Sequence, residues 1–196
     1  MATKFSITCT NVYGLDFSLK ASGNPMRTNV DMSEVTDKDL TRAEKLGSCQ
    51  SGLGHDNFLK GIIVQMNVTA PLYWWKQAQR YHWLEFISSQ STMHCLLKFN
   101  IEEQCVEETD KVILARMKEL VDDYNSCEDN DEKTKKWRTL VASLPCGFCL
   151  TASMTTNYAQ LKTIYNQRNN HKLKEWHEFC DWAKNLPRCV DLTGIE

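Results

Sequence analysis

The side chains of this chain that could bind or transform a small molecule are mostly neutral and polar or cationic. They are His55, Arg80, His82, Ser88, Ser89, Ser91, Asn157, Arg168 and His171. Arginine forks and hydroxyl groups bind phosphate and the imide edge of a pyrimidine, and Trp74, Trp75 and Trp83 could wall a flat ring. Each residue alone has an ordinary structural explanation, such as a helix N-cap for Asn157. Together they favour a site for a planar, anionic small molecule.

Much of this set lies in the stretch 71–94. Pro71 suits a first helical turn, and a mostly apolar stripe recurs at three- and four-residue steps from Leu72 to Phe86. Neutral polar residues then follow in a row over 88–92. We therefore expect a helix that begins at Pro71 and leads into a hydroxyl-rich loop. The alternative is a half-buried amphipathic helix followed by an ordinary polar turn.

Length and composition are those of an ordinary globular chain. Its 196 residues suffice for one core, and hydrophobic and charged residues make up 42% and 24% of them. The net charge of -2 and the pI near 6.2 argue against general nucleic-acid or membrane-surface binding. There is neither a membrane-length apolar stretch nor the pattern of a signal peptide. We predict one domain over residues 1–196, located in the cytoplasm.

Cysteine is frequent, with nine residues. Without a secretion signal we expect reduced thiols and no disulfide framework. Cys146 and Cys149 form a CxxC pair, which could join His177 and Cys180 in a zinc site or act as a redox pair. Buried free cysteines are the simpler alternative. The histidines are not at metal-ligand spacing, so we predict no metal site.

Motifs of several enzyme classes are absent. The sequence has no GxSxG elbow, no P-loop and no GxGxxG after a strand. Acidic pairs such as Glu102-Glu103 and Asp122-Asp123 fall on charged helical stretches, where solvated charge is the usual explanation.

Periodicity predicts an α+β fold with more helix than strand. Alternation predicts two strands or a bulged hairpin over 5–19 and a clear strand over 61–69, while 146–156 fits a loop or a strand. A short strand or a helix end is expected over 95–101. Helices are predicted at 36–47, 107–124, 133–143, 157–168 and 173–186. The expected architecture is a mixed or antiparallel sheet packed with several helices and a helix-rich C-terminal half.

The order of several motifs resembles the flavin-dependent thymidylate synthases. Gly54-His55-Asp56, a strand ending in Ala70-Pro71, and Arg80-Tyr81-His82 follow one another as a Gly-His-Glu turn, a strand, an Ala-Pro and an Arg-His-Arg do in that family. Asn157 and Arg168 stand where the family has an Asn before its long helix and an Arg that holds the pyrimidine. The likeness covers residues 50–95 and 145–185. The chain also resembles uncharacterised phage and prophage proteins of similar size.

The resemblance implies a family-like α+β fold and a homotetramer whose active sites combine several chains. It implies FAD as the cofactor and a dUMP-like nucleotide as the substrate, with folate and NADPH needed only if the chain is catalytically active. The residues carried over as cofactor contacts are His55, Arg80, His82 and Asn157. Those carried over as substrate contacts are Ser88, Ser89, Ser91 and Arg168, with Ser91 and Arg168 also in catalytic positions.

Several positions depart from the family pattern. The signature's Glu is Ser89, its last Arg is Met93, and its second and third residues are Tyr81 and His82. A flavin-contacting Arg of the last helix corresponds to Ala159. Each lost charged hydrogen bond is worth about 1.5–3 kcal/mol, so the resemblance implies a depleted flavin site.

Three functions are therefore open. The first is an active flavin-dependent thymidylate synthase or a close uridylate-modifying relative. The second is a non-catalytic homologue that binds or sequesters a nucleotide or a nucleotide-derived signal. The third is a structural or interaction protein that uses the tryptophan-rich surface around residues 74–83, and burial of its three tryptophans would count against it.

Overall fold

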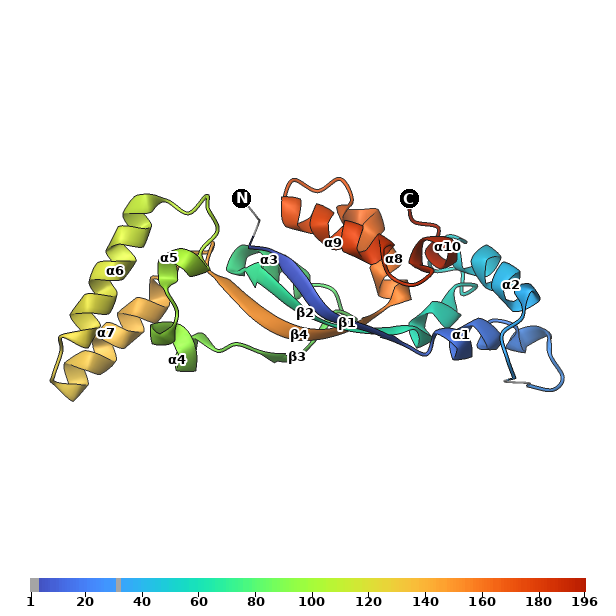
Figure 1. The fold of residues 1–196 in the computed structure, drawn as a ribbon, viewed down its shortest axis with the longest axis horizontal. Coiled ribbons are helices and arrows are strands. Elements are labelled where there is room, and N and C mark those ends of the chain that lie inside the picture. Colours follow the sequence, from blue (N-terminus) through green and yellow to red (C-terminus); the bar gives the residue numbers. More distant parts are fainter. Residues whose placement is uncertain (1–3, 31–32) are drawn as a thin grey trace. The chain divides into compact units, whose positions relative to one another are not determined.

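The fold is α+β and contains a four-stranded antiparallel sheet. The computed structural model describes residues 4–30 and 33–196. The strands β1 (Ser6–Tyr13), β2 (Ile63–Pro71), β3 (Glu85–Ser89) and β4 (Cys149–Asn157) lie in the order β1-β2-β4-β3 (Figure 1). Val64, Met66 and Val68 of the central strand β2 are at most 2% exposed, whereas the residues between them are more exposed. This alternation confirms the strand predicted over 61–69.

Helices outnumber strands in the described residues, which confirms the predicted fold class. The α-helices are α1 (Leu15–Ala21), α2 (Asp37–Gly47), α3 (Leu72–Ala78), α4 (Thr92–Cys95), α5 (Ile101–Gln104), α6 (Lys111–Asn125), α7 (Asn130–Ala142), α8 (Tyr158–Arg168), α9 (Lys174–Lys184) and α10 (Cys189–Thr193). Short 3-10 helices are η1 (Asn24–Met26), η2 (Asn57–Gly61) and η3 (Leu96–Lys98). The helices predicted at 36–47, 107–124, 133–143, 157–168 and 173–186 are confirmed as α2, α6, α7, α8 and α9, with small shifts at their ends.

The chain folds into two compact units whose segments alternate along the sequence. The first unit takes the described parts of residues 1–6, 68–78 and 88–152. The second takes the described parts of 7–67, 79–87 and 153–196. Each unit contains helices and part of the strands. The single domain expected over 1–196 stays a prediction.

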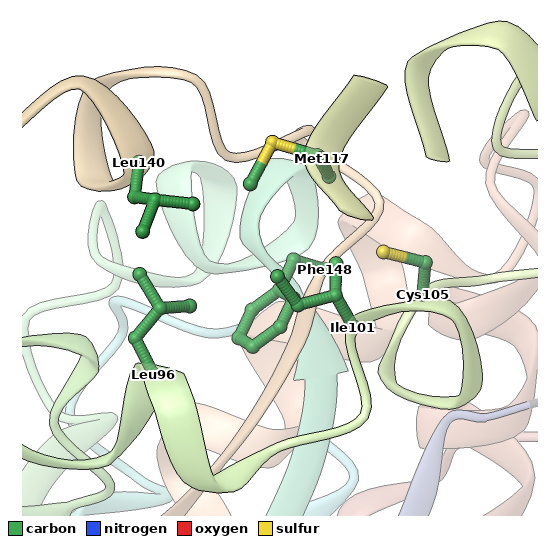
Figure 2. Close-up of a cluster of buried hydrophobic side chains, with 6 residues drawn as sticks. All are labelled: Leu96, Ile101, Cys105, Met117, Leu140 and Phe148. Atoms are coloured by element: carbon green, nitrogen blue, oxygen red, sulfur yellow. The ribbon is translucent and has the colours of Figure 1, made fainter. Parts of the chain in front are cut away.

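The first unit has its core beneath the helical hairpin of α6 and α7. Asp110 and Asp129 cap the two helices, because each side chain accepts a hydrogen bond from a backbone N–H in the first turn. Figure 2 shows the buried side chains of this core gathered around the ring of Phe148. They are Leu96, Ile101, Cys105, Met117 and Leu140.

The second unit packs α8 against α9, α10 and η2. Tyr158, Leu161 and Ile164 of α8 are at most 1% exposed, and so are Trp176 and Phe179 of α9. Burial of these large side chains supplies the main hydrophobic contribution in this unit. The packing fixes α8, which carries the residues of the candidate site.

Two predictions of local structure were wrong. Residues 15–21 form helix α1 and no second strand, because Gly14 leaves the strand with φ +73° and its carbonyl accepts from the N–H of Ser18. Helix α3 ends at Ala78, and residues 85–89 form the edge strand β3, since sheet pairing overrides helical periodicity there. Over 95–101, where a short strand or a helix end was expected, α4 ends at Cys95 and η3 follows, which confirms the helix end.

Buried Asp39 joins three cations in the second unit. Its carboxylate lies 3.3 Å from Lys20 Nζ and 2.7 Å from Arg27 Nη2, and it also pairs with Arg42. Thr36 and Asp39 form a capping box at the start of α2. The Arg42 guanidinium holds the pKa of Asp39 well below its usual range, although burial raises it, and Thr36 and Lys20 lower it further. The carboxylate therefore stabilises the folded unit in its charged form.

Substitution Asp39→Asn should lower the free energy of unfolding by about 3 kcal/mol, because it leaves the buried Lys20 ammonium without its counter-charge. Urea unfolding of the intact chain measures this change. Since the folded pKa is depressed, the contribution is present above the pKa of an unfolded Asp, about 3.9, and is lost as the pH falls below it. The variant should thus lose less stability than the wild type between neutral pH and acid. Exposed Asp37→Asn on the same helix is the control and should behave as the wild type does.

Candidate functional site

A pocket of about 400 Å³ lies in the second unit at the N-terminal end of α8. Its walls come from the loop before η2, from η2, from the first turns of α8 and from Trp83. We call it the α8 pocket. It is lined by Ser51, Gly52, Gly54, Asp56, Asn57, Lys60, Trp83, Asn157, Ala159, Gln160 and Thr163. Its volume falls within the range of small-molecule sites, about 300–1,000 Å³.

Lys162 of α8 holds the loop wall of this pocket. Its ammonium donates to the carbonyl of Gly47 at 2.6 Å and to the carbonyl of Cys49. It also lies 3.3 Å from Asp56 Oδ2, and the side chains of Lys162 and Asp56 are only 5% and 10% exposed. Gly52 and Gly54 adopt φ of +93° and +82°, a region that favours glycine and lets the loop turn sharply. The loop that carries His55 is therefore anchored at both ends.

The floor of the α8 pocket is the N-terminus of α8. Asn157 is the N-cap, as the sequence predicts, and its Oδ1 accepts from the N–H of Gln160 at 2.9 Å. Asn157 is 6% exposed and Gln160 is 9% exposed, yet both line the pocket. The pocket therefore presents two buried carboxamides.

The residues predicted to contact a cofactor differ in how close they lie to this pocket. Asn157 lines it, and His55 stands between the lining residues Gly54 and Asp56, with an exposed side chain. The ring of His82 packs edge-on against Trp83, with centroids 5.2 Å apart. Arg80 is exposed in the turn after α3 and is not a lining residue.

Arg168, predicted for the nucleotide, is held by an aromatic pair within the second unit. Its Nε donates to the hydroxyl of Tyr81 at 2.6 Å, and that hydroxyl donates to Gln167 Oε1 at 3.1 Å. The guanidinium also lies over the ring of Trp176, 4.9 Å from its centroid. Tyr81, a departure from the family pattern, therefore orients the arginine.

His171 lies one turn beyond Arg168. Partial burial lowers the pKa of this imidazole, and the positive charges of Arg168, His177 and Lys172 lower it further. The ring Nδ1 accepts a hydrogen bond from the N–H of Leu173 at 3.1 Å. These contacts give His171 a structural role just beyond the end of α8.

The predicted serines lie in the first unit, so the structure does not gather them with Arg168 into one unit. Ser88 and Ser89 are exposed at the end of β3, and Ser91 is half-buried at the N-cap position of α4. Gln90 between them exchanges two hydrogen bonds with the backbone of Thr151 on β4. The prediction of a hydroxyl-rich loop over 88–92 is therefore wrong, because this stretch pairs with β4.

The three tryptophans proposed as ring walls differ in exposure. Trp74 and Trp75 are 0% and 6% exposed and pack against each other in the first unit, whereas Trp83 is 54% exposed and lines the α8 pocket. Only Trp83 of this trio can serve as a wall. Burial of the other two counts against an interaction surface made from all three.

The cysteines and histidines show no gathered metal site. All nine cysteines are free, with Cys146 exposed and Cys149 buried. Burial raises the pKa of the Cys180 thiol to about 11 and opposes a thiolate ligand there. In residues 4–30 and 33–196, no group of three or more His, Cys, Asp or Glu side chains is placed to hold a metal ion. No helix in those residues is long and apolar enough to cross a bilayer.

Sequence reasoning missed Gln160 and Lys60 as pocket residues and Lys162 as the anchor of the loop. From the sequence alone, solvent exposure is the usual expectation for a glutamine in the first turn of a helix and for a lysine, because their neighbours in space are unknown. The one usable signal was the position of Gln160 three residues after the predicted N-cap. Such a position lies at the mouth of any site formed at that helix end.

The fold is similar to that of flavin-dependent thymidylate synthases. A structure of the enzyme ThyX from Helicobacter pylori, complexed with FAD and dUMP, superposes with a TM-score of 0.71 at 14% identity, over 96% of this chain and 97% of that one. A second ThyX structure from Helicobacter pylori, with FAD and dUMP, gives a TM-score of 0.71 at 15% identity, over 98% and 97%. No protein-family profile and no curated protein sequence matches the chain. The likeness establishes the fold.

The buried pair of Asp56 and Lys162 should show strong coupling in a double-mutant cycle. Lys162→Met leaves a buried carboxylate and two carbonyls without their donor, so we expect a loss of about 3–5 kcal/mol in the free energy of unfolding. Asp56→Asn and the double variant complete the cycle, with an expected coupling of about 1–3 kcal/mol.

The exposed pair of Lys135 and Glu132 is the matched control, since its ions are also 3.3 Å apart but its side chains are 74% and 51% exposed. Its coupling should stay below about 1 kcal/mol. Urea unfolding of all variants supplies the values. Equal coupling in the two pairs would contradict the anchoring role of Lys162.

Proposed function

We propose that this chain is a divergent flavin-dependent thymidylate synthase-like protein that binds a pyrimidine nucleotide such as dUMP, with FAD as a cofactor, for reductive methylation of uridylate. The α8 pocket carries this proposal, because Asn157 lines it and His55 and His82 flank it in a ThyX-like fold. The resemblance assigns all three residues to the cofactor. Their common location in the second unit supports a ligand site there.

The residues of the α8 pocket fit the ring system of a flavin better than its pyrophosphate. Trp83 offers an exposed aromatic face, while Asn157 and Gln160 offer amide groups that match the edge of a flat heterocycle. Among the described residues that line the pocket, Lys60 is the single cationic one. By the resemblance, Ala159 stands where the family has an arginine. The remainder of FAD would have to be held by Arg80 and by residues outside this pocket.

When bound, reduced flavin supplies a hydride and folate supplies the one-carbon unit, with NADPH as the reductant of the flavin. The chain's own groups would bind and orient. Arg168 would hold the anionic nucleotide through charge-assisted hydrogen bonds, and Ser88, Ser89 and Ser91 would donate hydroxyl hydrogens to it. In this proposal the chain forms a homotetramer in the cytoplasm, and residues from several chains complete each site. The protein would be of phage or prophage origin.

A second candidate function is a non-catalytic homologue that binds or sequesters a nucleotide or a nucleotide-derived signal. Three substitutions favour it, since Ser89, Met93 and Ala159 replace charged residues of the family. Met93 is 54% exposed, and its thioether cannot replace a bidentate guanidinium. Nucleotide binding without flavin chemistry would distinguish this function from the first.

An absorbance spectrum of the purified chain, reconstituted with FAD, tests the catalytic proposal. A bound flavin band together with oxidation of reduced flavin in the presence of dUMP is the expected result. A colourless protein that binds dUMP in calorimetry would point to the second candidate. A chain that binds neither FAD nor dUMP would reject both.

The same calorimetry tests Arg168. Replacement of a charged hydrogen-bond donor costs about 1.5–3 kcal/mol, so Arg168→Gln should weaken dUMP binding by about tenfold or more. Arg138→Gln removes an exposed arginine of α7 and serves as the control. Unchanged dUMP affinity in Arg168→Gln would exclude this arginine from the nucleotide site.

A further inference from the structure

A further pocket, of about 550 Å³, lies in the first unit, where α5 packs beside α6. One wall is residues 99–102, and the other is the face of α6 that runs from Lys111 to Asp122. We call it the α6 groove. We propose that the α6 groove binds a short apolar peptide with free termini, extended along α6. All its lining residues belong to the first unit, so this inference goes beyond the proposed function and does not rest on it.

The floor of the α6 groove is apolar. Phe99, Leu114 and Val121 line it, and all three are partly buried because they pack against the core of the first unit. The ring of Phe99 meets the ring of Phe148 edge-on, with the centroids 5.7 Å apart, and this contact holds the floor in place. Apolar side chains of a ligand would therefore meet a preformed surface that continues the hydrophobic core.

The rim of the α6 groove carries exposed charges of both signs. They are Glu102, Lys111, Lys118 and Asp122. Another exposed pair on α6 does form a salt bridge, since Arg116 lies 2.6 Å from Glu119. Among residues 4–30 and 33–196, however, the four rim side chains have no ion-pair or hydrogen-bond partner. A ligand with both a carboxylate and an ammonium group complements this rim, whereas a ligand with one charge would meet a like charge.

The length of the α6 groove matches an extended peptide. Lys111 and Asp122 lie in the same helix, and their separation in the sequence corresponds to about 16 Å at a rise of about 1.5 Å per residue. An extended chain advances about 3.3 Å per residue, so about five residues span this length. The terminal carboxylate then lies at Lys111 and the terminal ammonium at Asp122. Between them, Glu102 can accept from a peptide N–H and Lys118 can donate to a peptide C=O.

Calorimetry with the full chain and the pentapeptide Ala-Leu-Phe-Leu-Ala tests the inference. The peptide is used with free termini, in an N-acetylated form and in a C-amidated form. The free peptide should bind, and loss of either terminal charge should weaken binding by about two- to fivefold, as for an exposed ion pair. Asp122→Asn should abolish the difference between the free and the acetylated peptide. Lys111→Met should abolish the difference between the free and the amidated peptide.

Ala115→Gln provides a second kind of variant, because its longer side chain occupies the groove. It should weaken binding of the free peptide by about tenfold or more. Ala142→Gln makes the same change at an exposed alanine of α7 and is the matched control, which should bind as the wild type does. Thermal unfolding verifies that each variant folds. The inference is overturned if the free peptide gives no binding heat at about 1 mM, if Ala115→Gln binds it as the wild type does, or if both capped peptides bind as tightly as the free one.

Discussion

One buried ammonium group, that of Lys162, connects the elements that shape the candidate site. It donates to the carbonyl group of Gly47, the last residue of α2, and to that of Cys49, two residues further on. It also pairs with the carboxylate of Asp56 in the loop before η2. A charge with such low exposure persists only when opposite charge and hydrogen-bond acceptors surround it. The position of the pocket loop is thus tied to the register of α8, and through Gly47 to α2. A Cβ at Gly47 would collide with the carbonyl of Leu192, so α2 and α10 also approach closely there.

This arrangement changes the meaning of the motif Gly54-His55-Asp56. The resemblance makes it a motif of the ligand site, but here the carboxylate of its third residue, Asp56, forms an internal ion pair with Lys162. The motif therefore acts first as a structural turn, whose geometry presents the exposed His55 beside the pocket. A short site motif can persist in order and spacing while one of its members works inside the protein.

Elements with a strong local signal were predictable from the sequence. The strand β2 followed from alternation, and α8 followed from Asn157 as its N-cap and from the apolar residues behind it. The boundary between α3 and β3 was not predictable, because pairing of β3 with β4 decides it and helical periodicity runs through it. The burial of Gln160 and Lys162 was not predictable either. Lys162 is held by Gly47, which lies more than a hundred positions away in the sequence, and no local pattern carries that information.

The contact between Arg168 and Tyr81 has a consequence for the dynamics of binding. A long arginine side chain normally loses much rotamer freedom when it engages a ligand, up to about 2 kcal/mol. Here the Tyr81 hydroxyl and the Trp176 ring restrict the guanidinium within the folded chain. The side chain therefore loses this rotamer entropy during folding and does not lose it again when a ligand binds. An anion arriving at α8 would therefore meet a cation with a defined orientation, and association would require little rearrangement of the protein.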